Sequence, residues 1–154
     1  MAYPAGKSMI GNGVDRVLPQ EVFLHFLDLE VKRSRRYQNF FSVLVLKLDE
    51  LPDHDNGTAI QACWGRLIRL VAEEIRDSDI LGALGEKRLA VILPYADLMA
   101  GGNTRSRFES SLQLCDFSRD GFRVVIDQVC FPRDGTDTSD LVRKVTGIGT
   151  LSQR

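Results

Sequence analysis

One short string in this sequence pairs a guanidinium with a carboxylate three residues away. Arg76 and Asp79 form the only Arg-x-x-Asp string in the 154 residues. A guanidinium fork can donate two parallel hydrogen bonds and can stack on an aromatic plane, whereas a carboxylate can accept hydrogen bonds from N–H donors, so the pair could bind a planar polar group. Arginine at a helix end and Ser-Asp before a strand are also ordinary local structure, so a purely structural role fits the same residues.

The elements that would position this string follow from the spacing of apolar residues and from turn residues. The predicted order is helix 19–36, strand 41–46, helix 60–75, a hairpin of strands 80–84 and 89–94, helix 97–116, strand 122–131 and helix 138–145. The continuous apolar run at 41–46 is typical of a strand covered on both faces. Arg76 and Asp79 are therefore expected where a helix ends and an edge of the sheet begins.

Composition excludes several classes of protein. Hydrophobic residues make up 44% and charged residues 27%, and the net charge is −1, which gives no basic patch for DNA or a membrane surface. No apolar run approaches the roughly 20 residues of a membrane span, and residues 1–13 lack the apolar core of a signal peptide. Three widely spaced cysteines and two histidines do not favour a zinc site. We expect a cytoplasmic protein with free thiols and no metal.

The element order predicts one α/β (α+β) domain over 14–146, between a flexible leader, 1–13, and a flexible tail, 147–154. Its core order is β-α-β-β-α-β, which is typical of a ferredoxin-type sandwich with a mostly antiparallel central sheet. We expect the helices to lie on one face of that sheet.

Three strings make this order more specific. The segment 36–49 ends in Val45-Leu46-Lys47-Leu48-Asp49, the segment 78–94 contains Gly85-Glu86-Lys87-Arg88-Leu89, and Phe131-Pro132-Arg133-Asp134-Gly135 precedes Asp140-Leu141-Val142. Together, over about residues 15–145, they resemble a degenerate GGDEF (diguanylate cyclase-like) domain, and the resemblance implies the nucleotide-cyclase version of the ferredoxin-type fold.

The resemblance also bears on catalysis. Cyclases of this family hold Mg²⁺ with an acidic residue on the first strand and another in the hairpin, whereas this chain has Lys47 and the pair Lys87-Arg88 at the matching positions. Ammonium and guanidinium groups cannot ligate Mg²⁺. Trp64 falls on the position of the base-reading aspartate, and we expect it to be a core residue that fills the nucleotide cleft. The resemblance thus implies that the chain is not an enzyme and needs no cofactor.

A second site of the family, where cyclic di-GMP binds, matches better. The Arg-x-x-Asp motif of that site falls on Arg76 and Asp79, and Asp79 lies six positions before Gly85, as in the family. Its further arginines fall on Arg107, with Arg105 as a near neighbour, and on Arg33, which the family supplies from a second subunit. The resemblance implies a cyclic di-GMP receptor that relays the signal to a partner protein or fused domain, with a possible homodimer.

Two other functions remain open. The domain could be a ligand-free interaction or dimerisation module, in which the arginines are solvated surface charges. It could also be a GTP-binding regulator, in which Lys47, Lys87 and Arg88 hold phosphates without a metal. Titration with cyclic di-GMP and with GTP separates these functions.

Overall fold

The strand β1 (Phe41–Glu50) is central to the structure, a computed structural model that describes residues 14–52 and 59–147. It pairs antiparallel with β3 (Arg88–Pro94) on one side and with β4 (Phe122–Phe131) on the other. The hairpin partner β2 (Ile80–Ala83) extends the sheet to the order β2-β3-β1-β4. The predicted leader and the residues after Gly147 in the predicted tail lie outside the described residues, as does the segment 53–58.

The predicted elements are confirmed. The helices are α2 (Gln20–Tyr37), α3 (Ile60–Glu74), α4 (Leu98–Gln113) and α5 (Thr138–Gly147), with short 3₁₀ turns η1 (Val14–Arg16) and η2 (Phe117–Asp120). The order of the strands and their antiparallel pairing give the expected ferredoxin-type α+β sandwich. Gly85, with φ of +81°, occupies the hairpin turn in a conformation that favours glycine.

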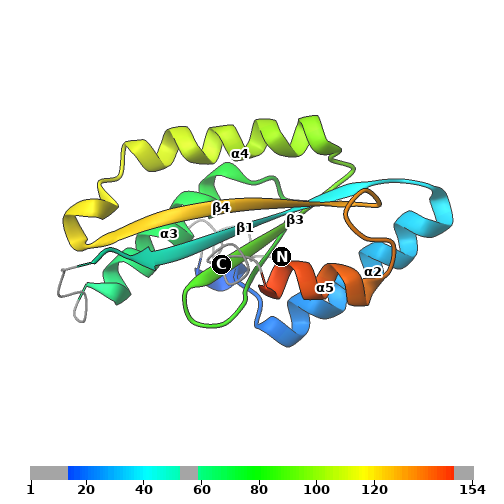
Figure 1. Ribbon diagram of the computed structural model, residues 1–154, viewed down its shortest axis with the longest axis horizontal. Helices are drawn as coiled ribbons and strands as arrows, with labels where there is room; N and C mark the ends of the chain where they lie inside the picture. Colours follow the sequence, from blue (N-terminus) through cyan, green and yellow to red (C-terminus); the bar gives the residue numbers. More distant parts are fainter. Residues whose placement is uncertain (1–13, 53–58, 148–154) are drawn as a thin grey trace, which may run out of the picture.

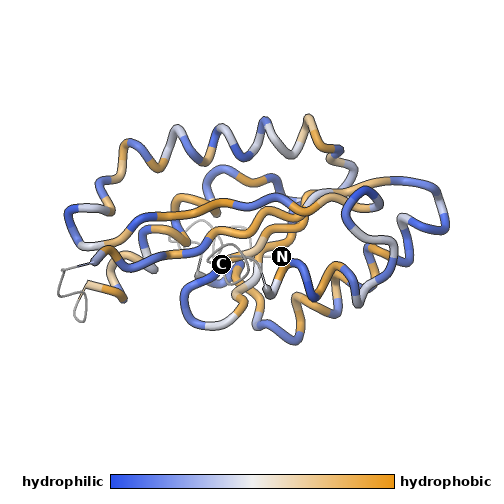
Figure 2. The backbone as a smooth tube through the Cα atoms, in the orientation of Figure 1, coloured by the Kyte–Doolittle hydropathy of each residue, from blue (hydrophilic) through white to orange (hydrophobic). Residues whose placement is uncertain are grey.

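Helices cover both faces of the sheet, so the expectation of helices on one face is wrong. Leu44, Leu46 and Leu48 point into a core that α3 and α4 close. Phe41, Val43 and Val45 point into a second core, closed by α2 and α5. Because β1 is buried on both sides, each face needs its own cover. Figure 1 shows α4 above the strands and α2 and α5 below them, and Figure 2 shows hydrophobic residues following the strands between these layers.

The start of α4 is fixed closely against the sheet. A Cβ at Gly101 would lie 2.7 Å from Ser42 Oγ and would also meet the side-chain amide of Gln128, so only glycine allows this approach. Ser42 Oγ donates a hydrogen bond to the carbonyl of Ala96 at 2.9 Å, and Asp97 caps the helix by accepting from the N–H of Ala100 at 2.8 Å. These contacts set where the outer residues of α4 lie.

Candidate functional site

Arg76 and Asp79 form the turn that joins α3 to β2, as the sequence predicts. The N–H of Asp79 donates to the carbonyl of Arg76 at 3.1 Å, and the N–H of Arg76 donates to Asp79 Oδ2 at 2.8 Å. Arg16 Nη2 donates to the carbonyls of both residues, at 3.1 and 3.3 Å. The turn is therefore held by side chains as well as by the backbone.

The two side chains of the motif form an ion pair. Arg76 Nη2 donates to Asp79 Oδ1 at 2.9 Å, and Arg76 Nε donates to Asp79 Oδ2 at 3.4 Å. The side chain of Asp79 is 3% exposed and that of Arg76 is 60% exposed. The carboxylate thus accepts one hydrogen bond from the backbone N–H of Arg76 and two from its guanidinium, which it orients while most of the arginine side chain stays exposed.

A cavity of about 290 Å³ lies beside this ion pair. Its lining residues come from the motif, the end of β3 and the outer face of α4: Arg76, Asp79, Leu93, Pro94, Tyr95, Ala96, Ala100, Asn103, Thr104 and Arg107. Arg76 also donates to the carbonyl of Pro94 at 3.3 Å. Arg107 reaches the same end of α3, because its Nε lies 3.5 Å from Glu74 Oε1. The structure therefore brings together three of the predicted residues, Arg76, Asp79 and Arg107.

Arg105 and Arg33 do not line this cavity. Arg105 pairs with Glu109 on the surface of α4, with 3.2 Å between Nε and Oε2. Arg33, on α2, donates to the hydroxyl of Tyr95 at 2.5 Å and stacks 4.7 Å from the centre of its ring. A hydrogen bond with Glu30 raises the pKa of the Arg33 guanidinium. Arg33 thus lies one side chain away from the cavity of its own chain.

Tyr95 is the residue of this site that sequence reasoning missed. It lines the cavity, carries Arg33 on its ring and is 58% exposed. Its φ of +63° turns the chain out of β3 toward α4. Nothing in the residue type signals this, because a tyrosine after a strand is unremarkable until its backbone conformation is known.

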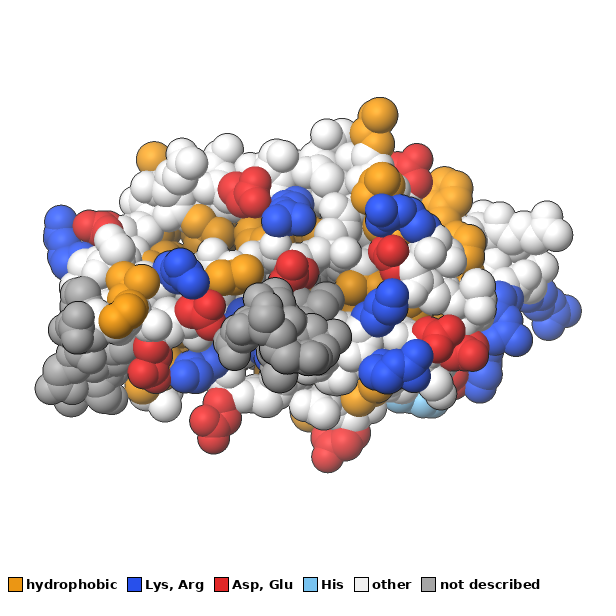
Figure 3. Space-filling view, viewed as in Figure 1, with side chains coloured by type: hydrophobic (Ala, Val, Ile, Leu, Met, Phe, Trp, Pro, Cys, Tyr) orange, Lys and Arg blue, Asp and Glu red, His pale blue; other side chains and the backbone are white. Residues whose placement is uncertain are grey.

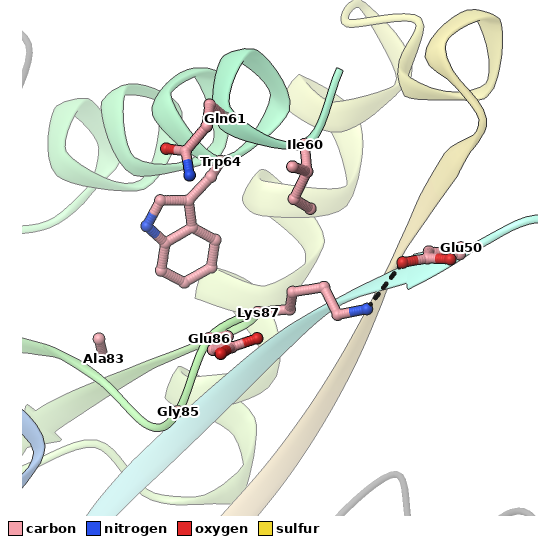
Figure 4. A pocket seen from close by; sticks show the side chains of 8 residues that line it. All are labelled: Glu50, Ile60, Gln61, Trp64, Ala83, Gly85, Glu86 and Lys87. Atoms are coloured by element: carbon pink, nitrogen blue, oxygen red, sulfur yellow. Dashed lines mark hydrogen bonds and ion pairs between the residues drawn. The ribbon is translucent and has the colours of Figure 1, made fainter. Parts of the chain in front are cut away.

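A larger cavity, of about 700 Å³, lies between α3 and the hairpin (Figure 4). Its lining residues are Glu50, Ile60, Gln61, Trp64, Ala83, Gly85, Glu86 and Lys87. Figure 4 shows the indole of Trp64 projecting from α3 toward the hairpin turn. Trp64 is partly buried against the core, but it forms a wall of the cavity and does not fill it. The expectation that Trp64 closes this cleft is therefore wrong.

The three cations near the hairpin each have a partner within the chain. Lys47 lies directly across from Arg88 in the ladder between β1 and β3, and its Nζ is 3.3 Å from Asp49 Oδ1. Lys87 Nζ donates to Glu50 Oε2 at 3.0 Å, and Arg88 Nη1 donates to the carbonyl of Thr146. In residues 14–52 and 59–147, no group of three or more His, Cys, Asp or Glu residues is arranged to hold a metal ion.

Comparison with known proteins adds evidence about the fold. No protein-family model matches the sequence, and no curated protein matches it. Among solved structures, a GGDEF domain from Pseudomonas aeruginosa is similar, with a TM-score of 0.71, 16% identity and coverage of 90% of this chain and 91% of that chain. The GGDEF domain of DgcB from Caulobacter crescentus, in complex with c-di-GMP, has a TM-score of 0.64 and 14% identity, and the match covers 90% of this chain and 84% of that chain. The active GGEEF domain of a diguanylate cyclase from Vibrio cholerae has a TM-score of 0.66 and 13% identity, and the match covers 90% of this chain and 91% of that chain.

The fold is thus that of GGDEF domains. The same comparison contradicts the expectation that the chain is not an enzyme, since the similar structures are GGDEF domains and one of them is the active GGEEF domain of a diguanylate cyclase. That expectation was wrong because it judged the catalytic site from a few side chains counted along the sequence, whereas the structure keeps an open cleft between α3 and the hairpin. No helix within the described ranges is long and apolar enough to cross a membrane.

Proposed function

We propose that this domain binds cyclic di-GMP in the cavity beside Arg76 and passes the level of that ligand to a partner protein. The observation that carries the proposal is the placement of Arg76, which Asp79 fixes and which lines the same cavity as Arg107. Cyclic di-GMP presents two guanine bases and two phosphates, so it needs donors for the bases and positive charge for the phosphates.

The site supplies both kinds of contact. Arg76 Nε and Nη2 donate to Asp79, and Nη2 also donates to the carbonyl of Pro94, so Nη1 remains to donate to guanine O6 or N7, while the guanidinium plane can stack on a base. Arg107 adds a second positive charge whose contact with Glu74 is long, at 3.5 Å, and whose side chain is 53% exposed. Tyr95 offers an aromatic face at the rim. The volume of about 290 Å³ suits one base, so the remainder of the ligand would lie over Tyr95 and Arg107.

Within this proposal, Asp79 contributes through Arg76. Because its carboxylate accepts three hydrogen bonds from Arg76, it acts mainly by positioning that arginine. Direct contact of Asp79 with the guanine N1–H edge would require the ion pair to open.

Calorimetry with cyclic di-GMP tests the proposal. Wild type should bind, and Arg76→Ala should weaken binding by about 1.5–3 kcal/mol, as expected for a charge-assisted hydrogen bond together with lost stacking. Arg107→Ala should weaken it less, with an effect that shrinks as salt is added. Arg105→Ala is the matched control, because Arg105 lies on the same helix but outside the cavity. Absence of binding heat with wild type at high micromolar ligand would refute the receptor function and would favour a ligand-free interaction module.

The larger cavity favours GTP as a second candidate ligand. Its volume of about 700 Å³ and the indole of Trp64 on its wall would suit a purine nucleotide. Titration with GTP in the same calorimeter, with Trp64→Ala as the affected variant and Arg76→Ala as the unaffected one, separates this ligand from cyclic di-GMP.

A further inference from the structure

Arg33 is held by contacts within its own chain. Its Nε donates to Glu30 Oε1 at 3.4 Å and its Nη2 donates to Glu30 Oε2, so Glu30 occupies the bidentate edge of the guanidinium. Glu30 is 7% exposed, and Arg33 Nη1 donates to the hydroxyl of Tyr95 at 2.5 Å. If Arg33 turned to a ligand on a second subunit, a buried carboxylate would lose its partner, which is strongly unfavourable. The geometry therefore favours a role for Arg33 within its own chain.

Tyr95 connects Arg33 to the cavity beside Arg76. The guanidinium carbon of Arg33 lies over the Tyr95 ring, 4.7 Å from its centre, and so covers one face of the ring. Tyr95 lines the cavity and is 58% exposed, so it still presents surface to a ligand. Arg33 can therefore influence that ligand by holding the ring, without touching the ligand itself.

The backbone of Tyr95 is held as closely as its side chain. Its φ of +63° is uncommon for residues other than glycine, asparagine and aspartate. Its N–H donates to the carbonyl of Phe40 at 3.1 Å, which fixes the strained turn against the start of β1. Strain of this kind persists where the surroundings hold it, and it clusters at ligand sites. Tyr95 is thus a residue whose position is set before any ligand arrives.

The end of the molecule beside Tyr95 carries positive charge. Arg35 and Arg36 are exposed on the last turn of α2, just before Phe40. Figure 3 shows several Lys and Arg side chains at the end where α2 leads into β1, whereas charges of both signs are interspersed over most of that face. An anionic ligand that covers the Tyr95 ring would be attracted to this end.

We propose that Arg33 is a positioning residue that holds the Tyr95 ring as a stacking platform for a guanine base of cyclic di-GMP bound to its own chain. This role rests on the proposed function and adds α2 to the site. A base can stack on an aromatic ring whatever its hydrogen-bonding edge, and a ring that is already fixed loses little freedom when the base arrives. No arginine from a second subunit is needed.

Calorimetry with cyclic di-GMP on a set of variants tests this role. Tyr95→Ala should weaken binding about five- to a hundredfold, the range for lost stacking between a base and an aromatic ring. Arg33→Ala, made together with Glu30→Gln so that no buried carboxylate is left unpaired, should weaken it about two- to fivefold. The same two changes in a Tyr95→Ala protein should have no further effect, because Arg33 acts only through the ring.

The end of α2 offers a matched control. Tyr37 is 62% exposed and has the guanidinium of Arg36 over its ring, 5.6 Å from the centre, but it does not line the cavity beside Arg76. Tyr37→Ala should therefore bind cyclic di-GMP as wild type does. Circular dichroism should show the native fold in every variant.

The outcomes separate this role from the proposed function. A wild-type protein that binds no cyclic di-GMP would overturn both. Binding by wild type that Tyr95→Ala leaves unchanged would overturn the platform and leave the receptor function standing. An equal loss on removal of Arg33 with and without the Tyr95 ring would show that Arg33 contacts the ligand directly, and would overturn the positioning role.

Discussion

Asp79 fixes Arg76 by accepting hydrogen bonds from its guanidinium at 2.9 and 3.4 Å and from its backbone N–H at 2.8 Å. The Asp79 carboxylate is almost fully buried and the Arg76 side chain is mostly exposed. The buried carboxylate therefore holds the arginine in place, and the exposed arginine can still donate hydrogen bonds to a ligand. A long arginine side chain loses much rotamer freedom in such a pair. The conformational entropy of the Arg76 side chain is therefore lost when the protein folds. A ligand that binds Arg76 does not have to order this side chain, so its binding does not carry that entropic cost.

Replacement of Asp79 should therefore affect both folding and binding. Asp79→Asn keeps the side-chain shape but removes the charge and turns one acceptor into a donor that faces Arg76. We expect a loss of about 1–3 kcal/mol in the free energy of unfolding, measured by urea denaturation. The affinity for cyclic di-GMP should fall about tenfold, a change of about 1.4 kcal/mol.

The neighbouring Asp77 provides the control for this variant. Asp77 is exposed, and Asp77→Asn removes the same charge two residues away. If Asp79→Asn and Asp77→Asn behave alike in both measurements, the anchoring role of Asp79 is wrong.

The close approach of α4 to the sheet gives a second prediction. Gly101→Ala would place a Cβ 2.7 Å from Ser42 Oγ, so the helix must shift, and we expect a loss of stability of about 1–3 kcal/mol. Gly102→Ala has its nearest neighbouring atom at 3.9 Å and should stabilise the helix by up to about 1 kcal/mol. Thermal unfolding of the two variants should show midpoint shifts of opposite sign, and shifts of the same sign would contradict the packing described here.

The single tryptophan reports on the larger cavity. Because Trp64 is partly buried and forms a wall of that cavity, its fluorescence should lie between the emission of buried and of fully solvated indole and should be quenched by acrylamide. Cyclic di-GMP should leave the emission unchanged, since the two cavities share no lining residue. GTP should change it. Emission at a fully buried wavelength, without quenching, would show that the cleft is closed in solution.

Acid should weaken the contact between α2 and α5. Asp28 accepts hydrogen bonds from Lys32 at 2.8 Å and from Thr138 Oγ1 at 2.7 Å, and these bonds lower the pKa of the Asp28 carboxyl. A carboxyl whose pKa is lower in the folded state stabilises the fold above its unfolded pKa, about 3.9, and this contribution is lost as the pH falls through the folded value. The midpoint of thermal unfolding should therefore drop less between pH 7 and pH 3 in Asp28→Asn than in wild type. Equal drops would show that this carboxyl does not contribute to acid sensitivity.

Local patterns in the sequence were sufficient for the elements and for part of the site. The apolar run at 41–46 correctly predicted a strand buried on both faces, and the Gly85 turn correctly predicted the hairpin. The position of the Arg-x-x-Asp string between a helix and a strand was also predicted, because it depends on neighbours in the sequence.

Features that depend on distant residues were not predictable in this way. The sides of the sheet on which the helices lie follow from crossovers, which apolar spacing does not determine. The contact of Arg33 with Tyr95 depends on the positive φ of Tyr95, and the buried state of Asp79 depends on Arg76 folding back over it. The open cleft beside Trp64 depends on the packing of α3 against the hairpin, so residue type alone suggested a filled core.

The two-sided pairing of β1 has a consequence for biosynthesis. β1 takes one set of backbone partners from β3 and the other from β4, where Phe41 pairs with Phe131 near the end of the chain. A ribosome-bound chain that has released the hairpin but not β4 therefore presents one bare, strongly apolar edge of β1, and such edges recruit other strands. Fragments that end between Pro94 and Phe122 should accordingly aggregate, and chaperone capture should concentrate in that interval of synthesis.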